Sequence, residues 1–388
     1  TFALIAAVSG QPPWFLTPAI AMLAYGYTFN MGFLNYYLSL GLAAFSLALL
    51  WRGRGLERIL GLLILPFILL AHPLGLLWLA GMAVYLILWT MLPSWSKLAA
   101  PCSALVAVYA VHLYLAHQAR FPVDWDRPAF YFMNGADQLT LYSPRYAALG
   151  WTALLFAVLC LLVAVISHRR EKSFWQSLRL PAELYFVAIV AVALLPENLR
   201  PSITGAWIGL LASRLTIITA IFGLCLLGSL KPRKWHLAGL AVCAIVFFAF
   251  LYQDTSKLNR MESQAEHLVR SLPFGTRVMA TIWAPPDSRI TFLGHLADRA
   301  CIGHCFSYAN YEPASGQFRI RVRPGSPVAA ATDDDSEDIQ AGEYDVQDED
   351  LPAMEIYQCD EKDLTKLSIR KLAAGEKNGR LGYNPHPD

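Results

Sequence analysis

Two side chains in this sequence have the type and position needed to bind a phosphate group at the edge of a membrane. His72 interrupts the apolar run 59–92 directly before Pro73, and Arg214 follows the apolar stretch GAWIGLLAS at 205–213. An imidazole offers a donor and an acceptor near neutral pH, and a guanidinium binds phosphate oxygens through paired N–H groups. His72 could therefore bind a lipid phosphate or an acceptor hydroxyl, and Arg214 could bind the phosphate of a lipid carrier. The alternatives are that His72 caps a helix and that Arg214 extends to lipid head groups.

Three carboxylates in the polar stretch 118–145 offer acid–base or metal chemistry. Asp124 and Asp126 flank Trp125, a spacing that could hold a divalent cation or supply a general base, and Asp137 follows in the same stretch. The surrounding FPVDWDRPAFYF is also typical of an amphipathic segment whose aromatic rings lie on the bilayer, and this interpretation is favoured. A divalent cation is the one cofactor that these residues leave open.

Two asparagines flank the start of an apolar span at 33–51. The amides of Asn30 and Asn35 could line a polar cavity that binds a substrate. Helix capping and packing are the favoured alternative, because Asn competes for backbone hydrogen bonds at helix ends.

The C-terminal part of the chain holds potential metal ligands and an acidic run. Within 295–305 these ligands are His295, Cys301, His304 and Cys305. Their spacing is not that of the common zinc sites, so we predict no metal site; a disulfide that involves Cys359 is an equally good interpretation in an oxidising compartment. The acidic run DDDSEDIQAGEYDVQDED at 333–350 is poor in core-forming residues, which predicts a disordered loop near 330–352.

The elements that must position these residues are membrane helices. Of the 388 residues, 56% are hydrophobic and only 15% charged, which is too apolar for an ordinary soluble domain. The apolar blocks are close to the ~20 residues that cross a hydrocarbon core. We predict an α-helical polytopic membrane domain at 1–253 and a small soluble α/β domain at 254–388. The predicted spans are 33–51, 59–71, 74–92, 98–117, 148–167, 181–195, 214–230 and 236–252, with a partial or interfacial segment at 14–27.

Charge predicts the topology of these spans. Because Lys and Arg concentrate in cytoplasmic loops, three basic connections are expected in the cytoplasm, with an even number of crossings between them. The run 59–92 must then cross twice, and Pro73 places the turn at His72 because helix is disfavoured before proline. The same parity places 118–145, 196–205 and the C-terminal domain outside the cytoplasm. The basic residues are Arg52, Arg54 and Arg58, then Arg169, Arg170, Lys172 and Arg179, and then Lys231, Arg233 and Lys234.

The order of these features resembles the GT-C superfamily of polytopic membrane glycosyltransferases. The resemblance rests on YGYTFNMGFLNYYLSLGLAAFSLALLWRGR (25–54), LLAHPLG (69–75), SRLTIITAIFGL (213–224) and LVRSLPFGTRVMATIW (268–283). It implies transfer of a sugar from a polyprenyl-phosphate donor to a lipid or glycan acceptor at the outer face of a bacterial inner membrane. It also implies that His72 and Arg214 hold the phosphate leaving group.

The resemblance further implies a catalytic acid in the first outer loop. Residues 1–30 contain no Asp or Glu, so this acid is expected upstream of Thr1 in a longer protein. Asp124 and Asp126 are the weaker candidates within the chain.

Two other classes of function are alternatives. A non-enzymatic membrane scaffold or complex subunit would bind a partner through the C-terminal domain. A transporter would carry charged residues deep in several spans, whereas these spans are almost free of charge. We find no phosphate-binding glycine loop, nucleophile elbow or basic stripe for nucleic acid, so a nucleic-acid partner is not expected.

Overall fold

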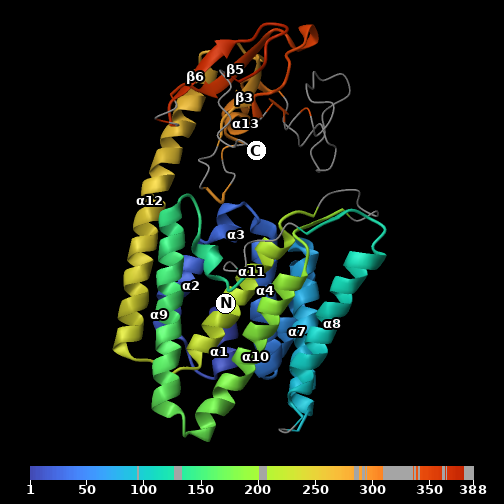
Figure 1. The fold of residues 1–388 in the computed structure, drawn as a ribbon, viewed down its shortest axis with the longest axis vertical. Helices are drawn as coiled ribbons and strands as arrows, with labels where there is room; N and C mark the ends of the chain where they lie inside the picture. Colours follow the sequence, from blue (N-terminus) through green and yellow to red (C-terminus); the bar gives the residue numbers. More distant parts are fainter. Residues whose placement is uncertain are drawn as a thin grey trace. The chain divides into compact units, whose positions relative to one another are not determined.

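The computed structural model describes residues 1–93, 96–125, 133–200, 208–283, 288–290, 293, 295–308, 335, 338–339, 341–360, 363 and 365–379 (Figure 1). The chain forms two compact units, 1–248 and 249–388. Their boundary falls five residues before the predicted one, inside the long helix α12 (Lys234–Arg270). Each unit is considered by itself.

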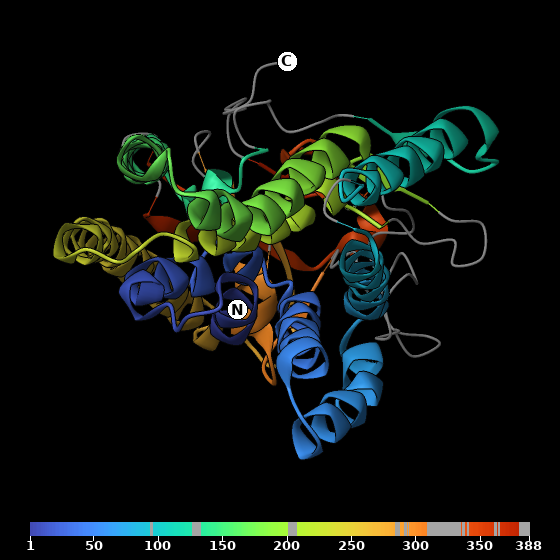
Figure 2. The same ribbon diagram turned by 90° about the horizontal axis from the view of Figure 1, so that it is seen from below.

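The first unit is a bundle of apolar helices. Among the described residues, seven helices are long and apolar enough to cross a membrane, and both views show them running alongside one another (Figure 1, Figure 2). The prediction of a helical polytopic membrane protein is therefore confirmed. These helices are α4 (Leu34–Arg52), α7 (Pro73–Met91), α8 (Ala99–Leu113, extended by a π-helical turn at Tyr114–Gln118), α9 (Pro144–His168), α10 (Lys172–Leu194), α11 (Leu211–Gly228) and α12.

The predicted span 59–71 is two short helices rather than one. The helix α5 (Leu56–Leu63) ends before Ile64, and α6 (Leu65–Ala71) begins there with Pro66 in its first turn. Proline has no N–H to donate to the carbonyl four residues earlier, so a continuous helix is interrupted at this point.

Short helices also occupy the N-terminal region. The predicted partial segment at 14–27 contains a 3-10 turn (Trp14–Leu16) and α2 (Thr17–Ala24), followed by α3 (Tyr27–Asn30). The helix α1 (Phe2–Ser9), which was not predicted, is buried against α4 and α11.

The run 59–92 folds back on itself at the predicted turn. His72 is extended between α6 and α7, with φ −167° and ψ 131°. The Ser46 hydroxyl donates to the Gly61 carbonyl, and the Ser39 hydroxyl donates to the carbonyls of Ile68 and His72. Because residue 61 pairs with 46 and residue 72 with 39, α5 and α6 run antiparallel to α4. From His72, α7 runs back until Trp89 donates to Glu183 near the start of α10, so the chain reverses at His72–Pro73 as predicted.

The three basic connections lie at one end of this bundle. Arg52 Nε donates to the Ala7 carbonyl, and the Gln11 amide donates to the carbonyls of Gly228 and Leu230 at the end of α11. Lys231 Nζ lies 3.6 Å from a Glu171 carboxylate oxygen in the α9–α10 turn. These contacts link all three connections, and we call this the basic end. The opposite end, where His72 and the start of α11 lie, is the polar end.

Two helices are longer than the predicted spans at 181–195 and 236–252. The helix α10 begins at Lys172, where Phe174 and Leu178 are buried, so part of the second basic connection is helical. The helix α12 continues to Arg270, since Met261, Ala265 and Val269 recur every four residues and form one apolar face. Apolar periodicity, and not membrane length, decides where these helices end.

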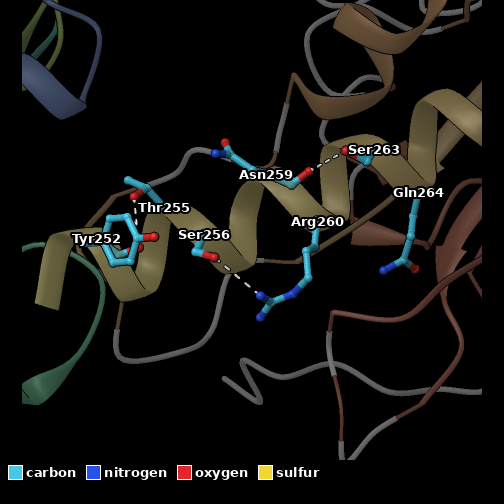
Figure 3. Close-up of a pocket in the computed structure, with 7 residues that line it drawn as sticks. All are labelled: Tyr252, Thr255, Ser256, Asn259, Arg260, Ser263 and Gln264. Carbon is cyan, nitrogen blue, oxygen red and sulfur yellow. Dashed lines mark hydrogen bonds between the residues drawn. The ribbon is translucent and has the colours of Figure 1, made fainter. Parts of the chain in front are cut away.

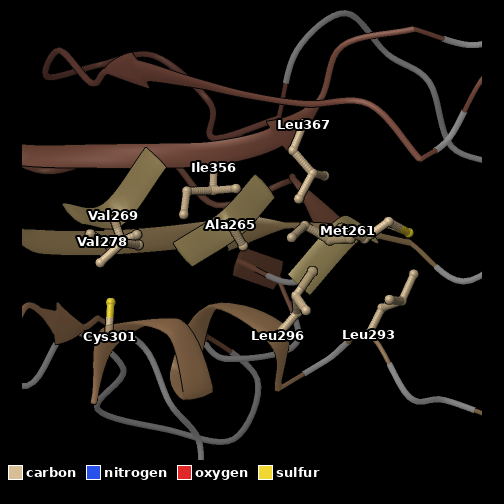
Figure 4. Close-up of a cluster of buried hydrophobic side chains, with 10 residues drawn as sticks. Met261, Ala265, Val269, Val278, Leu293, Leu296, Cys301, Ile356 and Leu367 are labelled. Carbon is tan, nitrogen blue, oxygen red and sulfur yellow. The ribbon is translucent and has the colours of Figure 1, made fainter. Parts of the chain in front are cut away.

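The second unit packs a small sheet on this face of α12. The strands lie in the order β4 (Phe306–Ser307), β3 (Arg277–Thr281), β5 (Ala353–Gln358) and β6 (Leu367–Lys371). β3 is parallel to β4 and β5, and β6 is antiparallel to β5. Val278 and Ile356 from the sheet meet Ala265 of α12 in the core, which α13 (Leu296–Cys301) completes (Figure 4).

Part of the acidic run is ordered, contrary to the predicted loop. Asp350 ends a 3-10 turn (Asp348–Asp350) and is only 2% exposed. Its carboxylate accepts hydrogen bonds from the hydroxyls of Tyr308 and Tyr344. Burial and these hydrogen bonds to the carboxylate raise the pKa of both tyrosines. A buried acid needs such partners, and the sequence spacing of 42 residues between Tyr308 and Asp350 hides them.

We predict that Ile356→Ala destabilises the second unit. Ile356 is fully buried between α12 and the sheet, and truncation of a buried Ile to Ala typically costs about 2–5 kcal/mol. Thermal unfolding of the full chain in detergent, followed by limited proteolysis, measures the loss. Ile302→Ala removes the same atoms from a residue that is 80% exposed. This control should leave the unfolding temperature and the resistance to proteolysis unchanged. If Ile356→Ala and Ile302→Ala were equally resistant to heat and protease, the burial of Ile356 in this unit would be contradicted.

Candidate functional site

Arg214 lies at the polar end with an aromatic group beneath it. It belongs to the first turn of α11, and its guanidinium carbon is 3.7 Å from the centroid of the Phe33 ring. This is a cation–π contact. Tyr36 and Glu197 lie within electrostatic range of the guanidinium. Within the described chain, Arg214 Nε has no hydrogen-bond partner.

Tyr36 lies near both predicted phosphate-binding residues, His72 and Arg214. Its ring meets the His72 ring edge-on at 5.6 Å between centroids. The side chain is 1% exposed, yet its hydroxyl has no hydrogen-bond partner among the described residues. We call Phe33, Tyr36, His72, Glu197 and Arg214 the Arg214 cluster. A buried hydroxyl without a partner costs free energy, which marks this cluster as a place where a ligand would supply the missing acceptor.

His72 caps α7 and still keeps one nitrogen available. Its Nδ1 accepts the Leu74 amide hydrogen at 3.2 Å, so the proton of the neutral ring is assigned to Nε2. Burial, and then the positive charge of Arg214, lower the pKa of His72 below its ordinary value. At neutral pH the ring is therefore an uncharged Nε2–H donor. The capping alternative is correct, and it leaves a hydrogen-bond donor for a ligand.

A glycine and a serine hold His72 in place. A Cβ on Gly75 would lie 2.1 Å from Ser39 Oγ, so only glycine allows α7 to approach α4 this closely. The same Ser39 hydroxyl donates to the His72 carbonyl at 2.7 Å. The position of the imidazole therefore depends on the α4–α7 contact.

Glu197 caps the helix that carries Arg214. Its carboxylate accepts the Ser213 amide hydrogen at 3.1 Å, and its carbonyl accepts that of Leu211. A negative charge is favourable at a helix N-terminus. The sequence analysis did not predict a role for Glu197. Its position in PENLRP, directly after the predicted span 181–195, could have indicated one.

Asp124 takes part in a small sheet beside this cap. β1 (Val123–Asp124) pairs with β2 (Asn198–Leu199), and the Asn198 amide donates to the Asp124 carboxylate at 2.7 Å. This contact gives Asp124 a structural role at the polar end. Asp126, its partner in the predicted cation or base site, lies outside the described residues. Among those that are described, no group of three acidic, His or Cys side chains could hold a metal ion.

Asp137 and Gln138 form a buried hub under α11. Thr216 Oγ1 donates to the Asp137 carboxylate at 2.6 Å, and the Gln138 amide donates to Thr216 Oγ1 at 2.7 Å. The Gln138 oxygen accepts from Thr28 of α3. Gly135 makes the approach possible, since a Cβ there would meet the Ala220 backbone at 2.4 Å. Gln138 was not predicted, because its partners are distant in sequence.

The two predicted asparagines have mainly structural contacts. The Asn30 amide donates to the carbonyls of Tyr25 and Gly26, and its oxygen accepts from the Tyr142 hydroxyl at 2.8 Å. The Asn35 side chain is exposed and its oxygen accepts the neighbouring Tyr36 amide hydrogen. Capping and packing, the favoured alternative, account for both.

An apolar groove runs along α7, α8, α10 and α11 between the two ends of the bundle. Its volume is about 700 Å³ and its walls are almost entirely hydrophobic. Leu195 and Leu215 line it toward the polar end, so that it finishes beside Arg214. Leu88, Ala100 and Leu184 line it toward the basic end. From Leu184 to Leu195 the rise along α10 is about 17 Å at 1.5 Å per residue.

The predicted ligands of the second unit have other partners. Cys301 and Cys305 form a disulfide, and Cys359 is exposed and outside it, so a disulfide with Cys359 is wrong. His295 Nδ1 lies 2.7 Å from the Asp298 carboxylate, and His304 Nε2 lies 2.8 Å from the Leu272 carbonyl. These contacts give each predicted ligand a structural role.

This unit also has an open polar hollow along α12. Its volume is about 540 Å³ (Figure 3). In this hollow the Arg260 guanidinium donates to the Ser256 hydroxyl at 3.4 Å. The Gln264 side-chain amide donates to the Thr365 carbonyl, and its oxygen accepts the Leu367 amide hydrogen. The side chains on its wall are Tyr252, Thr255, Ser256, Asn259, Arg260, Ser263 and Gln264.

Comparison with known proteins identifies no relative. No family model matches the chain, and no curated protein or solved structure shows significant similarity to it.

We predict that Gly75→Ala disturbs the Arg214 cluster while Gly81→Ala does not. The added methyl group at 75 collides with Ser39 Oγ, whereas a Cβ at 81 in the same helix meets nothing within 4 Å. Overpacking of this kind costs about 1–3 kcal/mol, so Gly75→Ala should lower the melting temperature in detergent. Gly81→Ala should leave it unchanged or raise it, because Ala favours helix. Equal melting temperatures would contradict the α4–α7 contact.

Proposed function

We propose that this protein is a membrane glycosyltransferase that moves a sugar from a polyprenyl-phosphate donor to a lipid or glycan acceptor. The observation that carries the proposal is the pair of unsatisfied buried groups, Arg214 Nε and the Tyr36 hydroxyl. Both are donors; the Tyr36 ring contacts the His72 ring, and the charge of Arg214 acts on both Tyr36 and His72. Donor groups from three neighbouring side chains suit the oxygens of a phosphate.

The apolar groove supports a lipid-linked donor. A polyprenyl chain is hydrocarbon, and a groove with hydrophobic walls about 17 Å long offers it contact without exposing polar groups. The groove ends beside Arg214 on α11, because Leu215 lines it. A lipid phosphate at the Arg214 cluster would therefore lead its chain directly into the groove.

In this reaction Arg214, His72 and Tyr36 would stabilise the phosphate leaving group. The acceptor oxygen attacks the anomeric carbon, the bond from that carbon to the phosphate oxygen breaks, and the electron pair stays on the phosphate. The acceptor proton passes to a general base. Arg214, His72 and Tyr36 would offset the negative charge that develops on the phosphate, where fixed donors in a site of low dielectric are most effective.

Two observations support reaction at the outer face of a bacterial inner membrane. The basic end carries Lys and Arg residues of the kind that concentrate on the cytoplasmic side, which supports an outer position for the Arg214 cluster. The disulfide Cys301–Cys305 suits an oxidising compartment for the second unit.

We expect Arg214→Gln to weaken binding of a polyprenyl phosphate by about ten- to a hundredfold. A hydrogen bond to a charged group is worth about 1.5–3 kcal/mol. Binding is measured by native mass spectrometry in detergent, with the unphosphorylated polyprenol as the second ligand. The polyprenol should bind wild type and Arg214→Gln equally, because the variant alters only the phosphate site.

Two further variants act as controls for this prediction. Arg214→Lys should recover part of the affinity, since it keeps the charge but not the paired donors. Arg260→Gln changes an exposed arginine of the second unit and should bind like wild type. If Arg214→Gln binds the phosphate as tightly as wild type does, the phosphate role of this cluster is wrong.

A scaffold that binds a partner through the second unit is the second candidate function. Phe274 and Ile302 are 83% and 80% exposed, the highest values among the large hydrophobic side chains described. Their two turns are held together, since the Gly275 amide donates to the His304 carbonyl at 2.9 Å. Rigid exposed apolar side chains are typical of interaction surfaces.

The double variant Phe274→Ser, Ile302→Ser tests the scaffold function. If the protein is a scaffold, mass photometry of the protein released from native membranes should show a large complex for wild type and the free chain for the variant. Ser271→Ala, in the same turn, should keep the complex. If the double variant keeps transfer activity, this surface is not needed for the proposed glycosyltransferase reaction. If wild type and the double variant give identical particle masses, the scaffold function is rejected.

A further inference from the structure

The polar hollow along α12 lies on the helix face that points away from the core of the second unit (Figure 3). The residues on its wall recur every three or four positions, which is the spacing of one helix face. Asn259 in the hollow is two residues from the buried Met261, which separates them by about 160° around the helix. The hollow therefore uses a surface of α12 that packing against the sheet leaves open.

Several polar groups on this wall have no partner within the described chain. The Asn259 side-chain amide and the Tyr252 hydroxyl form no hydrogen bond there. The Arg260 guanidinium has one long hydrogen bond, to Ser256 at 3.4 Å, and among the same residues it has no ion pair. Arg270 on the same helix, by contrast, pairs with Glu266. The hollow thus offers one unpaired cation together with uncharged donors and acceptors.

Tyr252 adds an exposed aromatic ring to these groups. Its side chain is 77% exposed. A sugar can pack its apolar C–H face on such a ring, because the ring is itself apolar on its faces. The sugar hydroxyls, each a donor and an acceptor, match the amide of Asn259 and the hydroxyls of the hollow. The combination of ring, amide and hydroxyls suits a saccharide.

Other classes of macromolecule fit this wall less well. A bound peptide uses a sheet edge, an apolar groove or a cluster of arginines, and the described residues of the wall form none of these. A nucleic acid needs several cations along its phosphates, whereas the described wall has only Arg260.

The position of Arg260 on α12 excludes a phospholipid head group. The apolar part of this helix ends at Leu251, and the rise from Leu251 to Arg260 is about 13 Å at 1.5 Å per residue. The head-group layer on each side of a hydrocarbon core is only about 5–8 Å thick. A polar ligand that reaches Arg260 from the membrane must be longer, as a chain of sugars is.

We propose that the hollow binds an acidic oligosaccharide. Arg260 pairs with an anionic group of the glycan, Asn259 bonds sugar hydroxyls, and one sugar packs on the Tyr252 ring. The unpaired charge of Arg260 selects an acidic glycan over a neutral one. A role of this glycan as the acceptor in sugar transfer rests on the proposed function, whereas the binding site itself does not.

The test is a ligand-observed NMR titration of the full chain with tetragalacturonate, which is acidic, and with maltotetraose, a neutral tetrasaccharide. The detergent must lack a sugar head group, which would compete for the hollow. Wild type should bind tetragalacturonate more tightly than maltotetraose. Arg260→Gln should weaken tetragalacturonate binding about fivefold, the upper range for one exposed ion pair, and leave maltotetraose binding unchanged. Tyr252→Ala should weaken binding of both, because the ring supports any sugar.

Two matched controls use Lys257, an exposed residue of the same helix that does not line the hollow. Lys257→Gln removes the same charge as Arg260→Gln and should bind tetragalacturonate like wild type. Ser263→Trp fills the hollow from an exposed position and should abolish binding. Lys257→Trp adds the same ring outside the hollow and should retain binding.

Four results would overturn the proposal. Equal losses in Lys257→Gln and Arg260→Gln would mean that surface charge alone attracts the glycan. Undiminished binding in Ser263→Trp would mean that the glycan binds elsewhere. Equal affinity of wild type for the two tetrasaccharides would remove the selection by Arg260, and binding of neither would reject the site.

Polyprenyl phosphate binding separates this inference from the proposed function. Arg214→Gln should bind tetragalacturonate like wild type, and Arg260→Gln should bind polyprenyl phosphate like wild type. If Arg214→Gln keeps its affinity for polyprenyl phosphate while the Arg260 and Ser263 variants lose the oligosaccharide, the proposed function fails and this site stands.

Discussion

The segregation of positive charge to one end of the membrane bundle is the constraint on which the rest of this structure depends. Cations are costly in hydrocarbon and stay in cytoplasmic loops. With three basic connections linked at one end, each connection that an odd number of crossings separates from them must emerge at the opposite end. His72, Glu197 and Arg214 come from three different connections or helix starts, and this constraint alone brings them to the same end.

Polar groups inside the bundle then divide into two kinds. Most are satisfied within the chain: Gln138 links α3 to α11, Glu197 caps α11, and Ser39 bonds the backbone that precedes α7. Such pairing is what burial requires. The Tyr36 hydroxyl and Arg214 Nε are buried without an acceptor among the described residues, as are the hydroxyls of Ser143 and Thr219. Tyr36 and Arg214 are candidates for a ligand because two such groups occur together in one cluster with His72.

The apolar groove lies next to these polar groups. Arg214 lies at one end of it, and Glu183, which accepts a hydrogen bond from Trp89, lies toward the other. An apolar groove that ends beside hydrogen-bond donors suits molecules that combine a phosphate with a long hydrocarbon chain. The carrier lipid of the proposed transfer reaction has that form.

The sequence by itself determined the features that depend on local chemistry. Apolar blocks predicted the long helices, Pro73 predicted the reversal at His72, and the three basic connections predicted a common end. The tertiary structure alone decided which groups meet over long sequence separations: Tyr36 with His72, Gln138 with Thr28 and Thr216, and Cys301 with Cys305 instead of Cys359. Helix formation and chain reversal follow from the nearest few residues, whereas packing across the bundle depends on close approaches such as that of Gly75 to Ser39, which no local pattern encodes.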